Sequence, residues 1–246
     1  MLKSLLIVCS FVSIIPVPQK FLPEWTSQNL RFFCVMLALT GIIIFSPLWM
    51  GLYILLRECV KFSGHFRGLV MTLATLALTG GLHMDGLMDT SDAIFSHRDR
   101  QTRLKILSDT HAGSFAVMAC VSALMLKTFL FAEIFESDNI NFYELALIPA
   151  WSRLGMALLL NNVKFAKSGG LAVMLGTSRS SRDNFIFAAV YVFLAVIDIS
   201  CGVIILLSLV IWRKVCIKIF GGITGDLLGA FVEASEIILL FVKVLQ

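Results

Sequence analysis

The chain contains apolar runs long enough to cross a lipid bilayer. Residues 32–56 and 112–135 each exceed the ~20 residues that a transmembrane helix needs. The sequence is 58% hydrophobic and 15% charged, with a mean hydropathy of +0.90, which excludes an ordinary soluble domain. Backbone polar groups inside a bilayer must be satisfied within their own segment, so these runs predict helices. We therefore expect an all-α, polytopic integral membrane helical bundle.

Four further apolar runs complete the pattern, at 68–82, 142–160, 185–212 and 223–245. The run 68–82 is short for a crossing, so it is expected to be either a re-entrant segment or a short span. The run 185–212 is apolar apart from Asp198 and fits either one long tilted helix or a hairpin of two short helices with Asp198 in the turn. We expect about six to seven transmembrane or re-entrant helices. No linker divides the chain, so residues 1–246 form a single membrane-embedded domain.

Basic residues predict the orientation. Fourteen of the twenty Lys and Arg residues fall in four connecting segments, at 57–67, 98–105, 164–182 and 213–218. The positive-inside rule places these segments in the cytoplasm, whereas the acidic segment from Glu133 to Asn141 is expected outside. The net charge of +4 follows from this topology, so no nucleic-acid partner is predicted.

An acidic stripe carries the strongest chemical signal. Asp85, Asp89 and Asp92 are spaced at i, i+4 and i+7, so on a helix they share one face. Three like charges repel one another, and a bound divalent cation would remove that repulsion. Carboxylate oxygens suit Mg²⁺ or Mn²⁺ better than Zn²⁺. His83 precedes the stripe and is a candidate catalytic residue with the three aspartates.

Two other segments on the predicted cytoplasmic face could bind phosphate. Asp109 lies at the start of the run 112–135, where a helix N-terminus would favour an anion. Asp109 could equally be the N-cap of that helix. Lys164 and Lys167 are followed by Ser168-Gly169-Gly170, a pattern typical of a phosphate-binding loop. We therefore take Asp109, Lys164 and Lys167 as candidate substrate-binding residues.

The C-terminal half adds four more polar candidates. Thr224 and Asp226 belong to a glycine turn that opens the last apolar run, and Glu233 lies on the same helix face as Asp226. Arg153, inside the run 142–160, either binds substrate or pairs with a buried carboxylate such as Glu233 or Glu236. Together with the acidic stripe, these residues supply what phosphoryl transfer requires, namely positioning and charge neutralisation.

Five segments of the sequence resemble those of one known family. The segment from Gly80 to Asp92, GGLHMDGLMDTSD, resembles the signature of the cobalamin synthase family, the adenosylcobinamide-GDP ribazoletransferases. Other segments resemble the family in the same order along the chain, at Phe11 to Pro18, Ile106 to Gly113, Ser152-Arg153 and Gly222 to Ala230.

The resemblance implies a Mg²⁺-dependent, multi-pass enzyme of the bacterial inner membrane whose active site faces the cytoplasm. Its partners would be adenosylcobinamide-GDP and α-ribazole or its 5′-phosphate, and its products adenosylcobalamin or its 5′-phosphate and GMP. On this hypothesis Asp85, Asp89 and Asp92 hold the metal, and Lys164 or Lys167 neutralises the diphosphate. A carboxylate or His83 accepts the hydroxyl proton. The oligomeric state stays open, with a homo-oligomer among the options.

Two rival functions remain at this stage. A CDP-alcohol phosphotransferase also uses membrane-edge aspartates, but its motif expects Ala-Arg after Asp-Gly, where this chain has Leu87-Met88-Asp89-Thr90. An ion-coupled transporter would bind ions near the bilayer midplane through Asp85, Asp226 and Glu233. No repeat relates the two halves of the sequence, which weakens the transporter hypothesis.

Overall fold

The computed structural model describes residues 1–58, 61–137, 141–167, 175 and 179–246. This part of the chain is helical throughout, apart from turns, loops and one isolated bridge between Phe165 and Ile223, which confirms the all-α fold class. The α-helices are α1 (Leu2–Val12), α2 (Ser27–Leu30), α3 (Phe33–Thr40), α4 (Ser46–Glu58), α5 (Gly64–Leu78), α6 (Leu82–Phe95), α7 (Arg100–Ile106), α8 (Ser114–Glu136), α9 (Phe142–Asn162), α11 (Asp183–Ile197), α12 (Ile199–Val215) and α13 (Gly225–Val244). A 3₁₀ turn, η1 (Gln19–Phe21), and two π-helical turns, η2 (Gly41–Phe45) and η3 (Cys216–Phe220), complete the set.

The bundle has the lengths and the surface of a membrane protein. Three helical stretches are long and apolar enough to cross a bilayer, namely Phe33–Glu58, Ser114–Glu136 and Phe142–Asn162. Large apolar side chains also cover the outer faces of the bundle; Phe185 on α11 is 81% exposed and Ile211 on α12 is 62% exposed. Apolar surface of this extent fits contact with lipid, so the fold agrees with a polytopic membrane protein.

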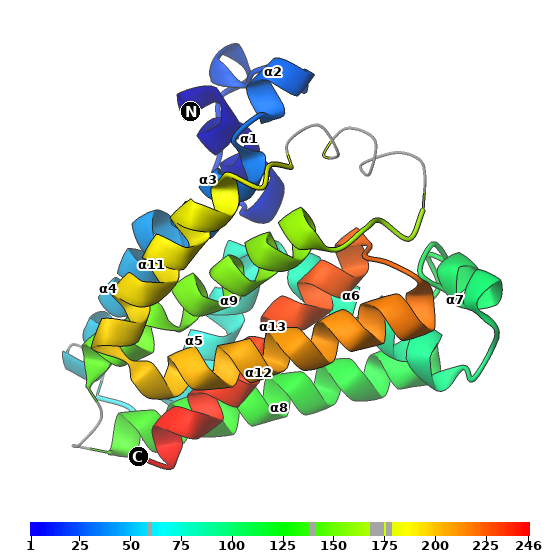
Figure 1. Cartoon of the computed structure of the whole chain (residues 1–246). Helices are drawn as coiled ribbons and strands as arrows, with labels where there is room; N and C mark the ends of the chain where they lie inside the picture. Colours follow the sequence, from blue (N-terminus) through cyan, green and yellow to red (C-terminus); the bar gives the residue numbers. More distant parts are fainter. Residues whose placement is uncertain (59–60, 138–140, 168–174, 176–178) are drawn as a thin grey trace.

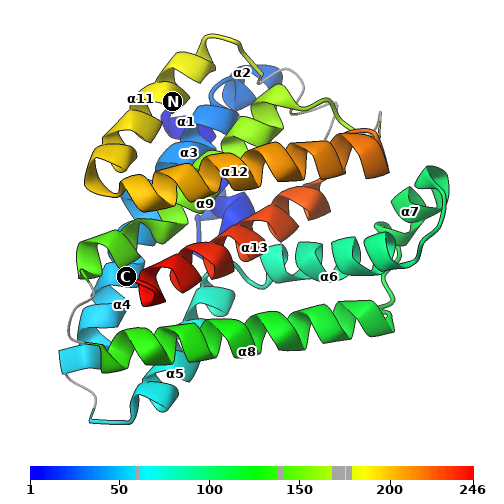
Figure 2. The ribbon, with the colours of Figure 1, turned by 60° about the horizontal axis from the view of Figure 1, so that its bottom comes forward.

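The long helices run between two ends of the bundle (Figures 1 and 2). At one end Asp92 of α6 accepts a hydrogen bond from the backbone N–H of Gly113, just before α8, and we call this the Asp92 end. At the other end Lys243 Nζ lies 2.7 Å from Asp198 Oδ2 and 2.6 Å from Glu144 Oε2, and we call this the Asp198 end. Helix α7 lies at the Asp92 end and the C-terminus at the Asp198 end.

Helices α5 and α6 together form one broken crossing. Near the start of α5, His65 Nδ1 lies 3.5 Å from Oε1 of Glu136, at the Asp198 end, whereas α6 reaches the Asp92 end. The break between them contains Gly80 (φ +62°) and Gly81 (φ +76°), a left-handed conformation that favours glycine. The alternative that 68–82 is re-entrant is therefore wrong. The three aspartates of α6 lower its hydropathy and hide the second half of the crossing.

The side assigned to one basic segment is wrong for the same reason. Arg57 donates a hydrogen bond to the carbonyl of Ser137, at 3.3 Å, so the described parts of the segment 57–67 lie beside the described part of the acidic segment at the Asp198 end. An odd number of crossings separates it from the later basic segments. The described parts of those segments lie at the Asp92 end, in 98–105, 164–167, 179–182 and 213–218.

The structure also settles the form of the two irregular apolar runs. Asp198 stands between α11 and α12, where its Oδ1 accepts hydrogen bonds from Cys201 N (3.1 Å) and Ser200 Oγ (2.7 Å), so the hairpin interpretation of 185–212 is confirmed.

The first long crossing is interrupted at η2, where a Cβ on Gly41 would lie 2.7 Å from the neighbouring α9 backbone. Over the described residues the chain passes between the two ends seven times, in agreement with the expected six to seven.

Candidate active site

Two glycines bring α6 and α13 into close contact. A Cβ on Gly86 would lie 2.6 Å from the carbonyl oxygen of Asp226, and a Cβ on Gly229 would lie 3.1 Å from Cα of His83. Small residues of this kind let helix backbones approach closely in membrane proteins. The contact places the acidic stripe of α6, including Asp85, beside the first turn of α13, and Figure 2 shows the two antiparallel helices side by side.

Five aspartates gather at this contact, and we call them the carboxylate cluster: Asp85, Asp89, Asp92, Asp109 and Asp226. The other four carboxylates are close enough to Asp89 to repel its charge. Within the described ranges, no residue donates a hydrogen bond or forms an ion pair with Asp85 or Asp89. The cluster therefore carries negative charge that the described part of the protein does not neutralise.

Asp92 has a separate role from its neighbours on the stripe. Its Oδ2 accepts the N–H of Gly113 at 2.6 Å, and its Oδ1 accepts the N–H of Ala116 at 2.9 Å. Those N–H groups belong to the N-terminus of α8, where free donors and the helix dipole favour an anion. Asp92 therefore caps α8 from another helix, which joins α6 to α8 and leaves fewer lone pairs for a metal.

Asp109 lies in the exposed loop between α7 and α8. Helix α8 begins at Ser114 with Gly113 at its N-cap, so the alternative that Asp109 caps this helix is wrong. Asp109 Oδ1 instead accepts hydrogen bonds from His111, from the backbone N–H at 3.1 Å and from Nδ1 at 2.8 Å. These hydrogen bonds hold the pKa of the Asp109 carboxyl below its usual value.

A glycine turn brings the lysine segment to the same end. Thr224 caps α13, since its Oγ1 accepts the N–H of Leu227 at 3.3 Å, and the same hydroxyl donates to Asp226 Oδ2 at 3.3 Å. Before it, a Cβ on Gly222 would lie 2.5 Å from the carbonyl oxygen of Lys164, so only glycine fits this close approach. The sequence-predicted turn is confirmed, and it packs the segment after α9 against the start of α13.

The two predicted lysines lie at the edge of the carboxylate cluster. Lys167 donates a hydrogen bond to Ser108 Oγ, and its charge acts on Asp226. Lys164 has an exposed side chain next to it. The glycines predicted to complete the phosphate loop, in Ser168-Gly169-Gly170, lie outside the described residues. The lysine pair is thus exposed and close to the cluster.

Arg100 is a cation that the sequence pattern does not assign to the site. Its guanidinium lies against Gly221, which has a positive φ of +73° at the start of the glycine turn. The basic segment 98–105 predicts orientation only. Its spacing contains no signal for proximity to residue 221, because that contact depends on the packing of α7 against η3.

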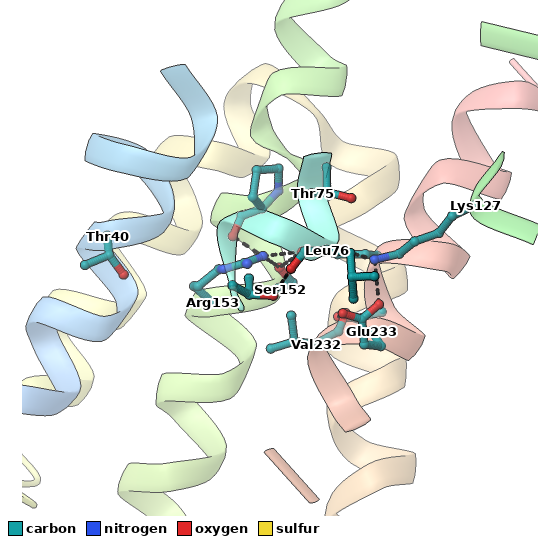
Figure 3. Close-up of polar contacts among 12 residues, drawn as sticks. Thr40, Thr75, Leu76, Lys127, Ser152, Arg153, Val232 and Glu233 are labelled. Atoms are coloured by element: carbon teal, nitrogen blue, oxygen red, sulfur yellow. Dashed lines mark hydrogen bonds and ion pairs between the residues drawn. The ribbon is translucent and has the colours of Figure 1, made fainter. Parts of the chain in front are cut away.

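A second charge cluster lies about midway along the bundle, and we call it the buried ion network: Lys127, Arg153, Glu233 and Glu236. Lys127 Nζ lies 2.6 Å from Glu233 Oε2 and 2.8 Å from Glu236 Oε2, and Arg153 pairs with Glu236 Oε1. Ser152 Oγ accepts a hydrogen bond from Arg153 at 2.9 Å. Each charged side chain is at most 4% exposed, and Figure 3 shows the network drawn together from α8, α9 and α13.

The buried ion network decides between two interpretations of Arg153. The alternative in which Arg153 pairs with a buried carboxylate is confirmed, and the partner is Glu236. Glu233, predicted to share the site with Asp226, instead faces Lys127 about two helical turns further along α13. Lys127 and Glu236 are not among the predicted site residues. A lone lysine inside an apolar helix is the signal that could have identified Lys127.

Two cavities meet at Asp85. The larger, an open groove of about 660 Å³ on the surface, is bounded by the C-terminal half of α5 and the start of α6. The smaller, of about 200 Å³, is more enclosed and lies between α1, α3, α6, α9 and α13. Asp85 lines both, whereas Asp226 lines only the smaller one. A carboxylate in the shared wall of two cavities can act on two bound molecules at once.

The carboxylate cluster fits a magnesium ion only with help from a ligand. In the described part of the chain, no three His, Cys, Asp or Glu side chains are close enough to hold a metal by themselves. Mg²⁺ commonly takes one or two protein carboxylates and completes its shell with water and substrate phosphates. The unneutralised Asp85 and Asp89, next to Asp226, suit that mode. Mg²⁺ binding stays a prediction.

These features define a class: a helical integral membrane protein with an acidic site, flanked by cations, at one end of its bundle. The chain belongs to the cobalamin-5-phosphate synthase family, whose sequence model matches residues 4–244. This confirms the resemblance found in the sequence.

Relatives named adenosylcobinamide-GDP ribazoletransferase match the chain over most of its length. The protein from Halalkalibacterium halodurans is 33% identical over 97% of this chain and 94% of its own. The proteins from Geobacillus sp. (strain WCH70) and Clostridioides difficile are 32% and 25% identical, over 94% and 97% of this chain and 91% and 96% of theirs. No solved structure matches.

Proposed function

We propose that this chain is a membrane-embedded adenosylcobinamide-GDP ribazoletransferase that completes the nucleotide loop of cobalamin. The family membership and the names of its relatives favour this function over a CDP-alcohol phosphotransferase or a transporter. The structural observation that carries the proposal is Asp85, an unneutralised carboxylate in the shared wall of two cavities. A transferase that joins two substrates needs a reactive group at the point where they meet.

The reaction exchanges a phosphoanhydride bond for a phosphate ester. A ribose hydroxyl of α-ribazole that is free in both the ribazole and its 5′-phosphate, and is therefore not the 5′-hydroxyl, bonds through its oxygen to the cobinamide-side phosphorus of adenosylcobinamide-GDP. The phosphoanhydride bond to the guanosine-side phosphate breaks, and GMP leaves with the bonding electron pair. The hydroxyl proton passes to a carboxylate, for which Asp85 is the best placed because it lines both cavities.

Asp89 and Asp226 would hold Mg²⁺ together with oxygens of the substrate diphosphate. When bound, the ion neutralises the charge that develops on the phosphates. Asp92 orients the N-terminus of α8 through its two backbone hydrogen bonds and so fixes the α6 stripe in place. Gly86 and Gly229 set the distance between the stripe and Asp226.

Cations at the rim of the carboxylate cluster suit the outgoing guanosine phosphate. Lys164 and Lys167 are exposed, and Arg100 lies against the glycine turn that precedes Asp226. Such groups bind phosphate through charge-assisted hydrogen bonds. Thr224, predicted to bind substrate, caps α13 and donates a hydrogen bond to Asp226, so it also orients that carboxylate.

The proposed orientation puts the Asp92 end in the cytoplasm of a bacterial inner membrane. Described parts of three of the four basic segments lie at that end, which the positive-inside rule assigns to the cytoplasm. Reporters at Lys61 and Ser137 should face the periplasm together, and a reporter at Arg179 should face the cytoplasm. Reporters at Lys61 and Arg179 on one side would contradict the broken α5–α6 crossing.

The direct test of function is GMP release by the purified protein in lipid. GMP should appear only when adenosylcobinamide-GDP and α-ribazole are both present, and a corrinoid carrying the nucleotide loop should form in equal amount. Omitting either substrate is the control. GMP release without ribazole would indicate a hydrolase, and ion flux without either substrate would favour the transporter.

A further inference from the structure

The smaller cavity has mostly apolar walls, with Asp85 and Asp226 on one side and a buried histidine that has no hydrogen-bond partner within the described chain. Its apolar lining comes from several helices, through Phe11, Phe33, Met156, Leu160 and Leu228. His83 also lines the cavity, and its side chain is buried, at 1% exposed. Among the described residues neither ring nitrogen of His83 has a hydrogen-bond partner.

A buried imidazole without a partner is unfavourable unless a ligand satisfies it. Leaving a buried donor or acceptor unpaired loses its hydration without compensation. A Cβ on Gly229 would lie only 3.1 Å from Cα of His83, so the backbone of α13 passes close to His83 and holds that residue in place. The neutral ring has one N–H donor and one acceptor, and because both nitrogens are buried, the side chain has to turn toward the cavity to reach a bound molecule.

The size of the cavity limits what that molecule can be. Its volume is about 200 Å³, below the ~300–1,000 Å³ of pockets that enclose drug-sized ligands. An apolar cavity of about 150 Å³ can hold a benzene ring. The smaller cavity therefore suits one flat bicyclic ring and excludes a corrinoid or a complete nucleotide.

Resting on the proposed function, we infer that the smaller cavity holds the benzimidazole base of the ribazole substrate, with His83 donating to the free ring nitrogen. Guanine is the other bicyclic base in the reaction. Among the described side chains that line the cavity, apart from His83, only Asp85 and Asp226 could accept the N–H groups of guanine, and the proposed function uses these carboxylates for the hydroxyl proton and the metal. The apolar walls would leave the guanine carbonyl unpaired. Benzimidazole, once joined to ribose, has a single polar ring atom, and His83 supplies a single matching donor.

The position of the cavity agrees with this assignment. Asp85 and Asp226 line it beside His83, so a base held there keeps its ribose next to the carboxylate cluster. The larger cavity lies on the other side of Asp85 and remains free for the second substrate. On this assignment, His83 determines which base is bound and does not accept the hydroxyl proton.

Filling the cavity tests the assignment through the kinetics. In Met156→Trp we expect the KM for α-ribazole to rise by roughly tenfold or more, with the KM for adenosylcobinamide-GDP unchanged. Met118→Trp, on the exposed face of α8, is the matched control and should change neither KM. An unchanged ribazole KM in an active Met156→Trp protein, or an equal rise in both KM values, would overturn the assignment.

Binding of free bases tests the role of His83 without turnover. Benzimidazole should bind the full-length protein more tightly than indole, which has the same shape but a C–H in place of the acceptor nitrogen. In His83→Phe the ratio of the indole Kd to the benzimidazole Kd should fall toward one, because the aromatic ring is kept and the hydrogen-bond donor is lost. A preference that His83→Phe leaves intact would contradict the inference.

The two tests separate this inference from the proposed function. If the wild-type protein releases no GMP with both substrates, the proposed function fails, and the binding test still decides whether the cavity takes a benzimidazole. If GMP is released but the cavity-filling variant and the base preference behave as in the wild type, the base lies elsewhere and only the inference fails.

Discussion

The carboxylate cluster at the Asp92 end and the buried ion network midway along the bundle share helix α13, yet their charges are balanced differently. In the network, two cations meet two carboxylates at hydrogen-bonding distances, and every charge has a partner. In the cluster, four carboxylates repel the charge of Asp89, and no described residue pairs with Asp85 or Asp89.

The difference separates a structural role from a functional one. A buried charge without a partner is strongly destabilising, so the network has to be complete for the bundle to fold. Asp85 of the cluster is exposed, unlike the residues of the network, so a cation from outside the protein can neutralise its charge. We conclude that the network holds α8, α9 and α13 together, whereas the cluster is completed by a cation and by substrate phosphates.

The largest effect on activity should come from Asp89→Asn. The amide keeps the shape of the side chain but removes the charge that would attract a cation, so turnover should fall by roughly 100-fold or more. The protein should remain inserted and folded. GMP release measures the loss, and Glu133→Gln, an exposed acid at the other end of α8, is the matched control. Wild-type activity in Asp89→Asn would remove this residue from the site.

The largest effect on stability should come from Glu236→Gln. This change leaves Arg153 without its carboxylate and Lys127 with one partner instead of two, and breaking a buried pair costs about 3–5 kcal/mol. Glu233→Gln removes only one contact of Lys127 and should cost less. Thermal unfolding in detergent measures both. An equal or reversed order would show that the network is not centred on Glu236.

A smaller effect is expected where α6 crosses α13. Gly86→Ala would push a Cβ to 2.6 Å from the Asp226 carbonyl, so the helices must separate, at about 1–3 kcal/mol and with reduced turnover. Gly225→Ala meets no atom within 4 Å and serves as the nearby control. Full activity in Gly86→Ala would mean that the spacing of the two helices does not matter for the reaction.

The smallest effect should come from Asp92→Asn. One amide oxygen can still accept an N–H of α8, but the second hydrogen bond and the charge at the helix N-terminus are lost, at about 1 kcal/mol. Hydrogen exchange at Gly113 and Ala116 should become faster, and turnover should fall less than in Asp89→Asn. A loss of turnover equal to that of Asp89→Asn would place Asp92 with the metal ligands.

Local signals in the sequence identify much of this arrangement. The i, i+4, i+7 spacing predicts Asp85, Asp89 and Asp92 on one helix, and α6 confirms it. The glycine turn before Asp226 also follows from local chemistry, since a positive φ at Gly221 and a Thr cap are short-range features.

Local sequence signals do not predict contacts between distant segments. That Asp92, and not Asp109, caps α8 depends on packing across 21 positions of the chain. The partners of Lys127 lie more than 100 positions away on α13. The run 68–82 looks too short for a crossing because the aspartates of α6 lower the hydropathy of the residues that follow it. The crossing nevertheless continues through α6.

A divalent cation that binds the carboxylate cluster together with the substrate diphosphate is the central element of the proposed mechanism. Electron paramagnetic resonance of Mn²⁺ with the purified protein in lipid tests this directly, with and without adenosylcobinamide-GDP. We predict that the corrinoid substrate strengthens Mn²⁺ binding to the wild-type protein and that Asp89→Asn abolishes this gain. Equal Mn²⁺ binding by both proteins in the presence of the substrate would contradict the account.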